Sequence, residues 1–176
     1  LLEFGAVPSA KPVRVDFNYD PLGFKEWDEE YGVVWQDEFL LLASCGYHDI
    51  LIPYIEKGVV TPDHATPDGH DMYYWAAEGG DPWMMVALLK YLPNVNSKRY
   101  RMGDLLNLSL LHVAAANDNE ETAKVLLENG IDTSSGLIVY HRDGSPVDIA
   151  GRQFGVDLAI SGYEKGERYP QYRVER

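Results

Sequence analysis

The chain has 176 residues, a formal net charge of −13, and 45% hydrophobic residues. This length is sufficient for one domain with a continuous hydrophobic core. The acidic balance argues against binding to nucleic acid or anionic lipid. No apolar stretch reaches the roughly 18 residues of a membrane-spanning helix. A single cysteine, Cys45, excludes an intramolecular disulfide and suits a reducing compartment.

The first residues, Leu1 to Gly5, have the pattern expected of the last turn of a helix that ends at a glycine. Glycine commonly ends a helix because it accepts the left-handed conformation. We therefore interpret residues 1–9 as the end of a structural unit that begins earlier. A removed targeting peptide is one explanation of this start, and a boundary of other origin is another.

Residues 10–36 form an insert that is both acidic and rich in aromatic side chains, among them Trp27 and Tyr31. A disordered acidic linker would be poor in aromatic residues. Two interpretations stay open. The aromatic side chains either cap the open end of the structure that follows, or belong to an arm that becomes ordered on a basic partner.

The next part of the chain repeats one pattern. From Ser109, a hydroxyl residue, two apolar residues, a histidine, an apolar residue and an alanine pair predict a short helix, and a second apolar run ends at Gly130. Altered copies start at Asp37, Asp71 and Ser145, at intervals of 34, 38 and 36 residues. Helices this short cannot bury their own apolar faces, so each pair requires a neighbouring pair.

This pattern resembles the ankyrin repeat, which has a period of about 33 residues. The resemblance implies an all-α fold: an ankyrin-repeat solenoid of stacked antiparallel helix pairs with extended finger loops. On this interpretation residues 1–9 end a preceding repeat, residues 37–161 hold about four degenerate repeats, and residues 162–176 are an extended tail. The repeats begin near residues 37, 71, 109 and 145.

One finger loop departs from an all-helical pattern. Residues 137–140 are apolar and precede Asp143-Gly144, a dipeptide typical of hairpin turns, so we expect a short strand there.

The sequence predicts no enzyme activity, no cofactor and no metal site. It contains no grouped nucleophile and base, and no phosphate-binding loop of the form G-x-x-x-x-G-K-[ST]. Thr61 to Asp71 includes two histidines and three aspartates, but its prolines and glycine indicate turns instead of a metal site. The ankyrin resemblance implies that His112 is neutral and structural.

Two segments are candidates for partner contact. Trp83 stands where the ankyrin pattern usually has an exposed glutamate, so it is either an anchor for a partner or packed under the loop at residues 92–94. Ser97 to Asp104 is the one dense basic run, which suits an acidic partner segment or the chain's own acidic insert.

We therefore expect a non-catalytic protein–protein interaction module or scaffold. The alternative is a fixed accessory subunit of a large enzyme complex, such as an organellar assembly. The expected partner is a protein with a basic surface, without nucleic acid, and the expected location is intracellular, in the cytoplasm or an organelle interior. The predicted partner-binding residues are Trp27, Tyr31, Glu78, Trp83, Arg99, Tyr100, Arg101 and Asn117.

Overall fold

The computed structural model of the chain describes residues 13–16, 33–103, 105–133, 138–141, 143–148 and 154–175. Helix is the main secondary structure of these residues. The α-helices are α1 (Glu38–Ser44), α2 (His48–Glu56), α3 (Met72–Gly79), α4 (Pro82–Leu89), α5 (Leu110–Ala116), α6 (Glu120–Glu128) and α7 (Phe154–Glu164). Two short 3-10 helices are η2 (Val95–Ser97) and η4 (Pro170–Tyr172).

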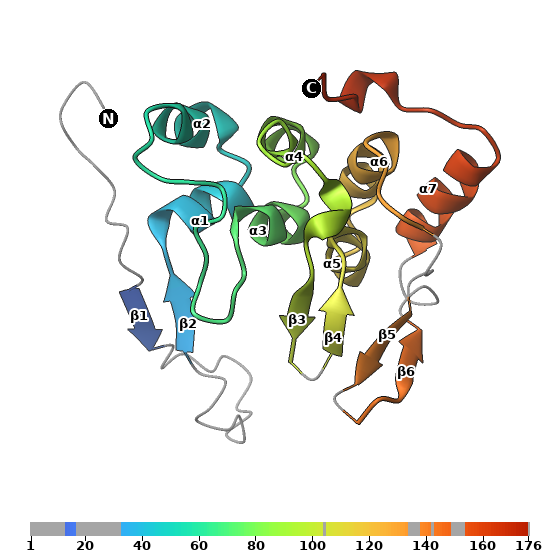
Figure 1. Ribbon diagram of the computed structural model, residues 1–176, viewed down its shortest axis with the longest axis horizontal. Helices are drawn as coiled ribbons and strands as arrows, with labels where there is room; N and C mark the ends of the chain where they lie inside the picture. The colour runs from blue at the N-terminus through green and yellow to red at the C-terminus, as the bar shows by residue number, and fades with distance from the viewer. Residues whose placement is uncertain are drawn as a thin grey trace.

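The first six helices pack in two layers (Figure 1). The helices α1, α3 and α5 lie side by side, and we call them the inner helices. The outer helices α2, α4 and α6 form the second layer, and each packs on the inner helix that precedes it in the chain. The structure therefore contains three consecutive helix pairs, each packed against the next.

Each inner helix begins at a residue whose side chain caps its N-terminus. Asp37 accepts hydrogen bonds from two backbone N–H groups of α1, and Asp71 does the same for α3. At α5, Ser109 accepts from the backbone N–H of His112, whose Nδ1 accepts from the backbone N–H of Ser109. Caps satisfy N–H groups that have no partner within the helix, so these residues fix where the helices start.

The core lies between the two layers and between successive pairs. Helix α4 contributes Met84, Met85, Leu88 and Leu89, all with no exposed surface. The alanine pair of the third copy, Ala114 and Ala115, is also fully buried, and small side chains there let neighbouring helices approach closely. Apolar burial of this kind is the main stabilising contribution to the fold.

Strands extend from the inner-helix side of the molecule (Figure 1). They are β1 (Val13–Asp16), β2 (Val33–Gln36), β3 (Tyr100–Met102), β4 (Leu105–Leu108), β5 (Ile138–His141) and β6 (Pro146–Asp148). The pair β1–β2 forms one antiparallel sheet, and β3-β4-β5-β6 form a second, also antiparallel. The expected all-α class is thus too narrow, because parts of the loops between helix pairs form hairpins. The chain is mostly helical with two small sheets.

The strand expected near residues 137–140 is confirmed as β5, which pairs with β6. Gly144 turns the chain between them with a φ of +84°. The sequence pattern at Ser145 predicts the opening helix of a fourth repeat, and this prediction is wrong for residues 146–148, because they pair with β5 across the turn.

The end of the chain also differs from the expected extended tail. Helix α7 packs against α6 and continues to Glu164, and a later segment includes η4. Gly162 lies inside α7, where an added Cβ would come within 2.5 Å of the Glu167 side chain. The glycine expected to interrupt this helix therefore does not do so, and the chain turns back after it, with the Glu167 backbone N–H donating to the Gly162 carbonyl oxygen at 2.9 Å.

Candidate functional site

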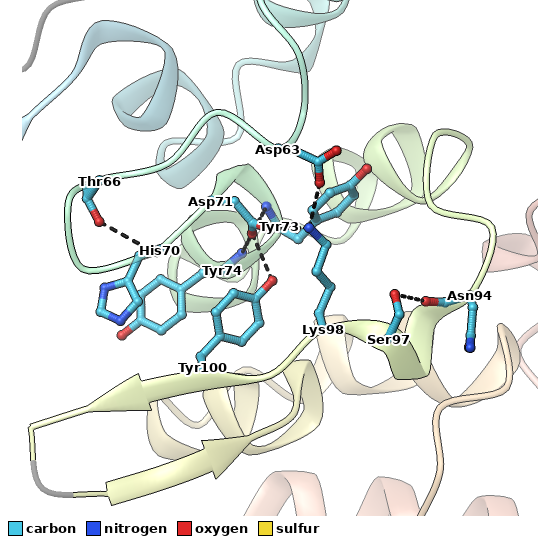
Figure 2. Close-up of polar contacts among 10 residues, drawn as sticks. All are labelled: Asp63, Thr66, His70, Asp71, Tyr73, Tyr74, Asn94, Ser97, Lys98 and Tyr100. Carbon is cyan, nitrogen blue, oxygen red and sulfur yellow. Dashed lines mark hydrogen bonds and ion pairs between the residues drawn. The ribbon is translucent and has the colours of Figure 1, made fainter.

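Asp71 is the centre of a buried polar site between α3 and the loop that precedes β3 (Figure 2). Its Oδ1 accepts hydrogen bonds from the backbone N–H groups of Tyr73 and Tyr74, each at 3.1 Å, and from the Tyr100 hydroxyl at 2.8 Å. Its Oδ2 lies 2.6 Å from Nζ of Lys98. One carboxylate thus caps a helix and also holds the following loop.

Lys98 connects this cap to a second carboxylate. Its Nζ lies 2.6 Å from Oδ1 of Asp63 and 4.9 Å from the centre of the Tyr73 ring (Figure 2). Burial by itself lowers the pKa of Lys98, but hydrogen bonds and attraction from Asp63 and Asp71 outweigh it and raise this pKa. The ammonium group therefore stays charged at neutral pH, between two carboxylates.

The phenols around Asp71 are held in their neutral form. Burial, followed by repulsion from Asp71 and nearby groups, raises the pKa of Tyr73 and of Tyr100. Burial also raises the pKa of Tyr74 to about 12, with a further contribution from Glu78. Neutral phenols and a paired Lys98 suit a site that joins two segments of the chain by hydrogen bonds.

A second contact of the same kind joins the first helix pair to its following loop. Nε2 of His64 lies 2.8 Å from Oδ2 of Asp37, the cap of α1. His64 follows Asp37 by 27 residues, and Lys98 follows Asp71 by the same 27 residues. We call these two contacts the cap latches.

The other histidine of that loop has different partners. His70 stacks on Tyr74, with ring centroids 3.9 Å apart and planes 5° from parallel, and its Nε2 donates to the Arg101 carbonyl oxygen at 2.6 Å. Within the described part of the chain, no group of three or more His, Cys, Asp or Glu side chains has an arrangement that would hold a metal ion.

The predicted partner-binding residues lie in several places. Trp27 and Tyr31 fall outside the described residues. Arg99 and Arg101 are exposed near and on β3, and Asn117 is exposed at the end of α5. Tyr100 is different: it is 6% exposed and bound to Asp71, so its ring belongs to the core instead of to a contact surface.

Glu78 lies on α3 and Trp83 on α4, the two helices of the second pair. Glu78 is half-buried, and this burial raises its pKa, while attraction to His70 partly offsets the rise. Trp83 is 49% exposed and packs edge-on against Tyr172, with ring centroids 5.4 Å apart. Trp83 thus contacts the C-terminal segment, whereas Glu78 interacts with His70, whose ring is bonded to the Arg101 carbonyl oxygen.

Sequence reasoning missed the cap latches and the docking of the C-terminal segment on α6. The equal 27-residue separations were present in the sequence as a signal, since both start from the aspartate that opens a repeat copy. For the C-terminal segment no such signal exists. Its alternating tyrosines and arginines gave no indication of which helix they contact.

Comparison with models of known protein families gives no match, and comparison with curated protein sequences gives none either. In the part of the chain that the structure describes, no helix combines the length and apolar character needed to cross a membrane.

Proposed function

We propose that this chain is a non-catalytic protein–protein interaction module or scaffold built from ankyrin repeats. The observation that carries the proposal is the succession of three helix pairs with matching caps. Asp37, Asp71 and Ser109 each open an inner helix, and the outer helix of each pair begins 11 residues after its cap. Repeated pairs of this kind provide extended surfaces made of equivalent positions, which suit binding of other proteins.

The cap latches support a binding role because they fix the loops between helix pairs. The latch at Asp71 places Arg99 and Arg101 on a loop whose neighbours Lys98 and Tyr100 are bonded to α3. A contact surface that is already ordered loses less conformational entropy when a partner binds. The charged groups of this site are all paired with one another, which suits positioning better than proton transfer or nucleophilic attack.

The proposed partner is a protein with a basic surface, because the chain carries a net charge of −13. Trp83 and the acidic insert with Trp27 and Tyr31 are the proposed anchors, since a few desolvated aromatic side chains commonly supply most of the affinity.

A pull-down from native extract tests this proposal. Wild-type chain, Trp27→Ala and Trp83→Ala are compared after thermal melting has shown that each variant is folded. Loss of the same basic protein from at least one variant is the expected result. Retention of every partner by both folded variants would contradict the choice of anchors, and tight binding of the wild-type chain to bare DNA would contradict the charge argument.

A fixed accessory subunit of a large assembly, such as an organellar enzyme complex, is the second candidate. It is favoured by large apolar side chains exposed on the first helix pair: Leu41 at 49%, Tyr47 at 56% and Ile50 at 39%. At the positions that match Leu41 and Ile50 in later pairs, Val113 and Met84 are fully buried. Large apolar side chains exposed on one helix pair suit a permanent contact with another protein.

Blue-native electrophoresis of untagged native material separates the two candidates. A free interaction module migrates mainly near its own mass or with variable partners, whereas a fixed subunit migrates entirely within one large species.

A further inference from the structure

The last described residues, Glu167–Glu175, lie across the outer helices α4 and α6 (Figure 1). We call this segment the strap. The residues that receive it are Trp83 on α4, Glu121 and Glu128 on α6, and Asn129 directly after α6, and we call them the strap surface. The strap shows what kind of segment this surface binds.

Part of the contact between the strap surface and the strap involves only backbone groups of the strap. The Asn129 side chain donates from Nδ2 to the Tyr172 carbonyl oxygen at 2.8 Å and accepts from the Val174 backbone N–H at 2.9 Å. Oε2 of Glu128 accepts from the backbone N–H of Tyr169 at 3.0 Å. Such bonds are available to any peptide that follows the same path, whatever its side chains.

The rest of the contact depends on two adjacent side chains of the strap. The Tyr172 ring packs edge-on against Trp83, and its hydroxyl donates to Oε2 of Glu121 at 2.6 Å. Arg173 donates from Nε and Nη2 to Oε1 of Glu128, at 3.0 and 2.6 Å. An aromatic ring with a hydroxyl and a guanidinium group therefore contact neighbouring positions of the surface.

The contact between Arg173 and Glu128 makes the strap surface selective for a positively charged group. The Glu128 side chain is only 1% exposed, whereas the Arg173 side chain that pairs with it is 64% exposed. A buried carboxylate without a cation is strongly unfavourable, so this surface requires a positive group at that point. A guanidinium group can reach it from outside with two donors, which suits arginine better than lysine.

We propose that the strap surface is a peptide-recognition surface for protein segments that follow the path of the strap and in which tyrosine is followed directly by arginine, and that the strap is its intramolecular occupant. The partner segment contributes the same cation and aromatic ring and displaces the strap. This inference deepens the proposed function, on which it rests, by naming the partner chemistry on the Trp83 side of the molecule.

A binding experiment with the full chain tests the inference. The probe is a fluorescently labelled synthetic peptide with the sequence of residues 167–175, followed by anisotropy. In the double variant Tyr172→Ala/Arg173→Ala the chain's own strap lacks both side-chain contacts. We expect this variant to bind the peptide at least about tenfold more tightly than the wild-type chain, in which the strap competes at high effective concentration.

Two controls define the specificity. A peptide in which the tyrosine and arginine that match Tyr172 and Arg173 are both alanine should bind at least about tenfold more weakly. Adding Trp83→Ala to the double variant should weaken binding of the original peptide by a similar factor. The single variant Tyr172→Ala keeps the ion pair between Arg173 and Glu128. If the double variant does not fold, this single variant replaces it in the experiment.

Three results would overturn the inference: no peptide binding by a folded strap variant, equal affinity of strap variant and wild type, or equal binding of the alanine peptide. These results are distinct from failure of the proposed function. A chain that loses its native partner on Trp83→Ala but does not bind the peptide retains the proposed function and loses this inference.

Discussion

Single residues set the turns between the inner and outer helices. Gly46, Gly80 and Asp118 lie nine residues after the three caps and have φ angles of 77°, 82° and 53°. The left-handed conformation is open to glycine and tolerated by aspartate, but costly for most other residues. Gly80 also has a steric requirement, since an added Cβ would come within 2.5 Å of Oδ1 of Asn119.

Gly80→Ala should therefore lower the free energy of unfolding by about 1–3 kcal/mol, from the left-handed backbone and the contact with Asn119 together. Asp118→Gly is the matched control at the equivalent turn and should change it by less than about 1 kcal/mol. Urea unfolding measures both values. If Gly80→Ala is as stable as the parent, the close approach of Asn119 does not constrain this turn.

The core also contains the buried hydroxyl group of Thr122. Thr122 in α6 has no exposed surface, and its hydroxyl has no hydrogen-bond partner among the residues that the structure describes. A buried hydroxyl without a partner loses its hydration and receives nothing in exchange.

Thr122→Val replaces that hydroxyl by a methyl group of similar shape and should raise the free energy of unfolding by about 1 kcal/mol. Thr122→Ser keeps the hydroxyl and removes the methyl group, so it should destabilise the chain. Chemical denaturation of the three proteins tests this order. A less stable valine variant would mean that the hydroxyl is satisfied in solution, for example by water.

At the scale of secondary-structure elements, α3 is joined to the following loop through its N-terminal cap. Its cap, Asp71, receives Lys98 and the Tyr100 hydroxyl, so helix start and loop position depend on one carboxylate. The pKa of Lys98 and that of Tyr100 are both raised in the folded chain. A lysine whose pKa is raised by folding stabilises the folded state at pH values below its ordinary pKa of about 10.4. This stabilisation is lost as pH rises through the pKa that the lysine has in the folded state.

The raised pKa of Tyr100 also lowers the stability of the folded chain as pH rises. Above about pH 10 the unfolded chain loses the phenol proton while the folded chain keeps it, so unfolding becomes more favourable as pH rises. We expect the free energy of unfolding to fall steeply with pH above about 10, and Tyr100→Phe to make that fall shallower. Urea titrations at a series of alkaline pH values measure the slope. An identical slope for parent and variant would show that Tyr100 ionises as readily folded as unfolded.

At the scale of the whole molecule, the strap ties the C-terminus to the outer layer through Glu128. Burial raises the pKa of this carboxyl, but the Tyr169 N–H and the Arg173 guanidinium outweigh burial and leave its pKa lowered. Glu121 also has a lowered pKa, mainly through hydrogen bonds from Lys124 and Tyr172. A carboxyl group whose pKa is lowered by folding stabilises the folded state at pH values above its ordinary pKa of about 4.3. This stabilisation is lost as pH falls through the pKa that the group has in the folded state.

Acidification below about pH 4 should therefore release the strap before the helix pairs unfold. NMR amide signals of Tyr169 and Val174 should move toward unstructured positions while those of α3 and α5 are unchanged. Glu128→Gln should weaken strap docking already at neutral pH, which separates this carboxyl from general acid unfolding. A strap that leaves only together with the inner helices would contradict the prediction.

The sequence alone was sufficient to locate the first three helix pairs, but not the fourth, where residues 146–148 form β6. The starts at Asp37, Asp71 and Ser109 follow from capping side chains, and the turns at Gly46 and Gly80 follow from glycine conformation. Both signals depend on residues within a few positions of one another, so they can be identified without knowing the rest of the fold. The same holds for β5, because a hairpin turn adjoins it.

Contacts between distant residues were decided by the folded structure. Sequence reasoning predicts a partner-binding role for Tyr100 and an extended C-terminal tail, whereas Tyr100 is bonded to Asp71 and Arg173 to Glu128. These partners are 29 and 45 residues apart in the chain. Which of many carboxylates receives a given hydroxyl or guanidinium depends on how the helix pairs pack, and local sequence carries no information about that choice.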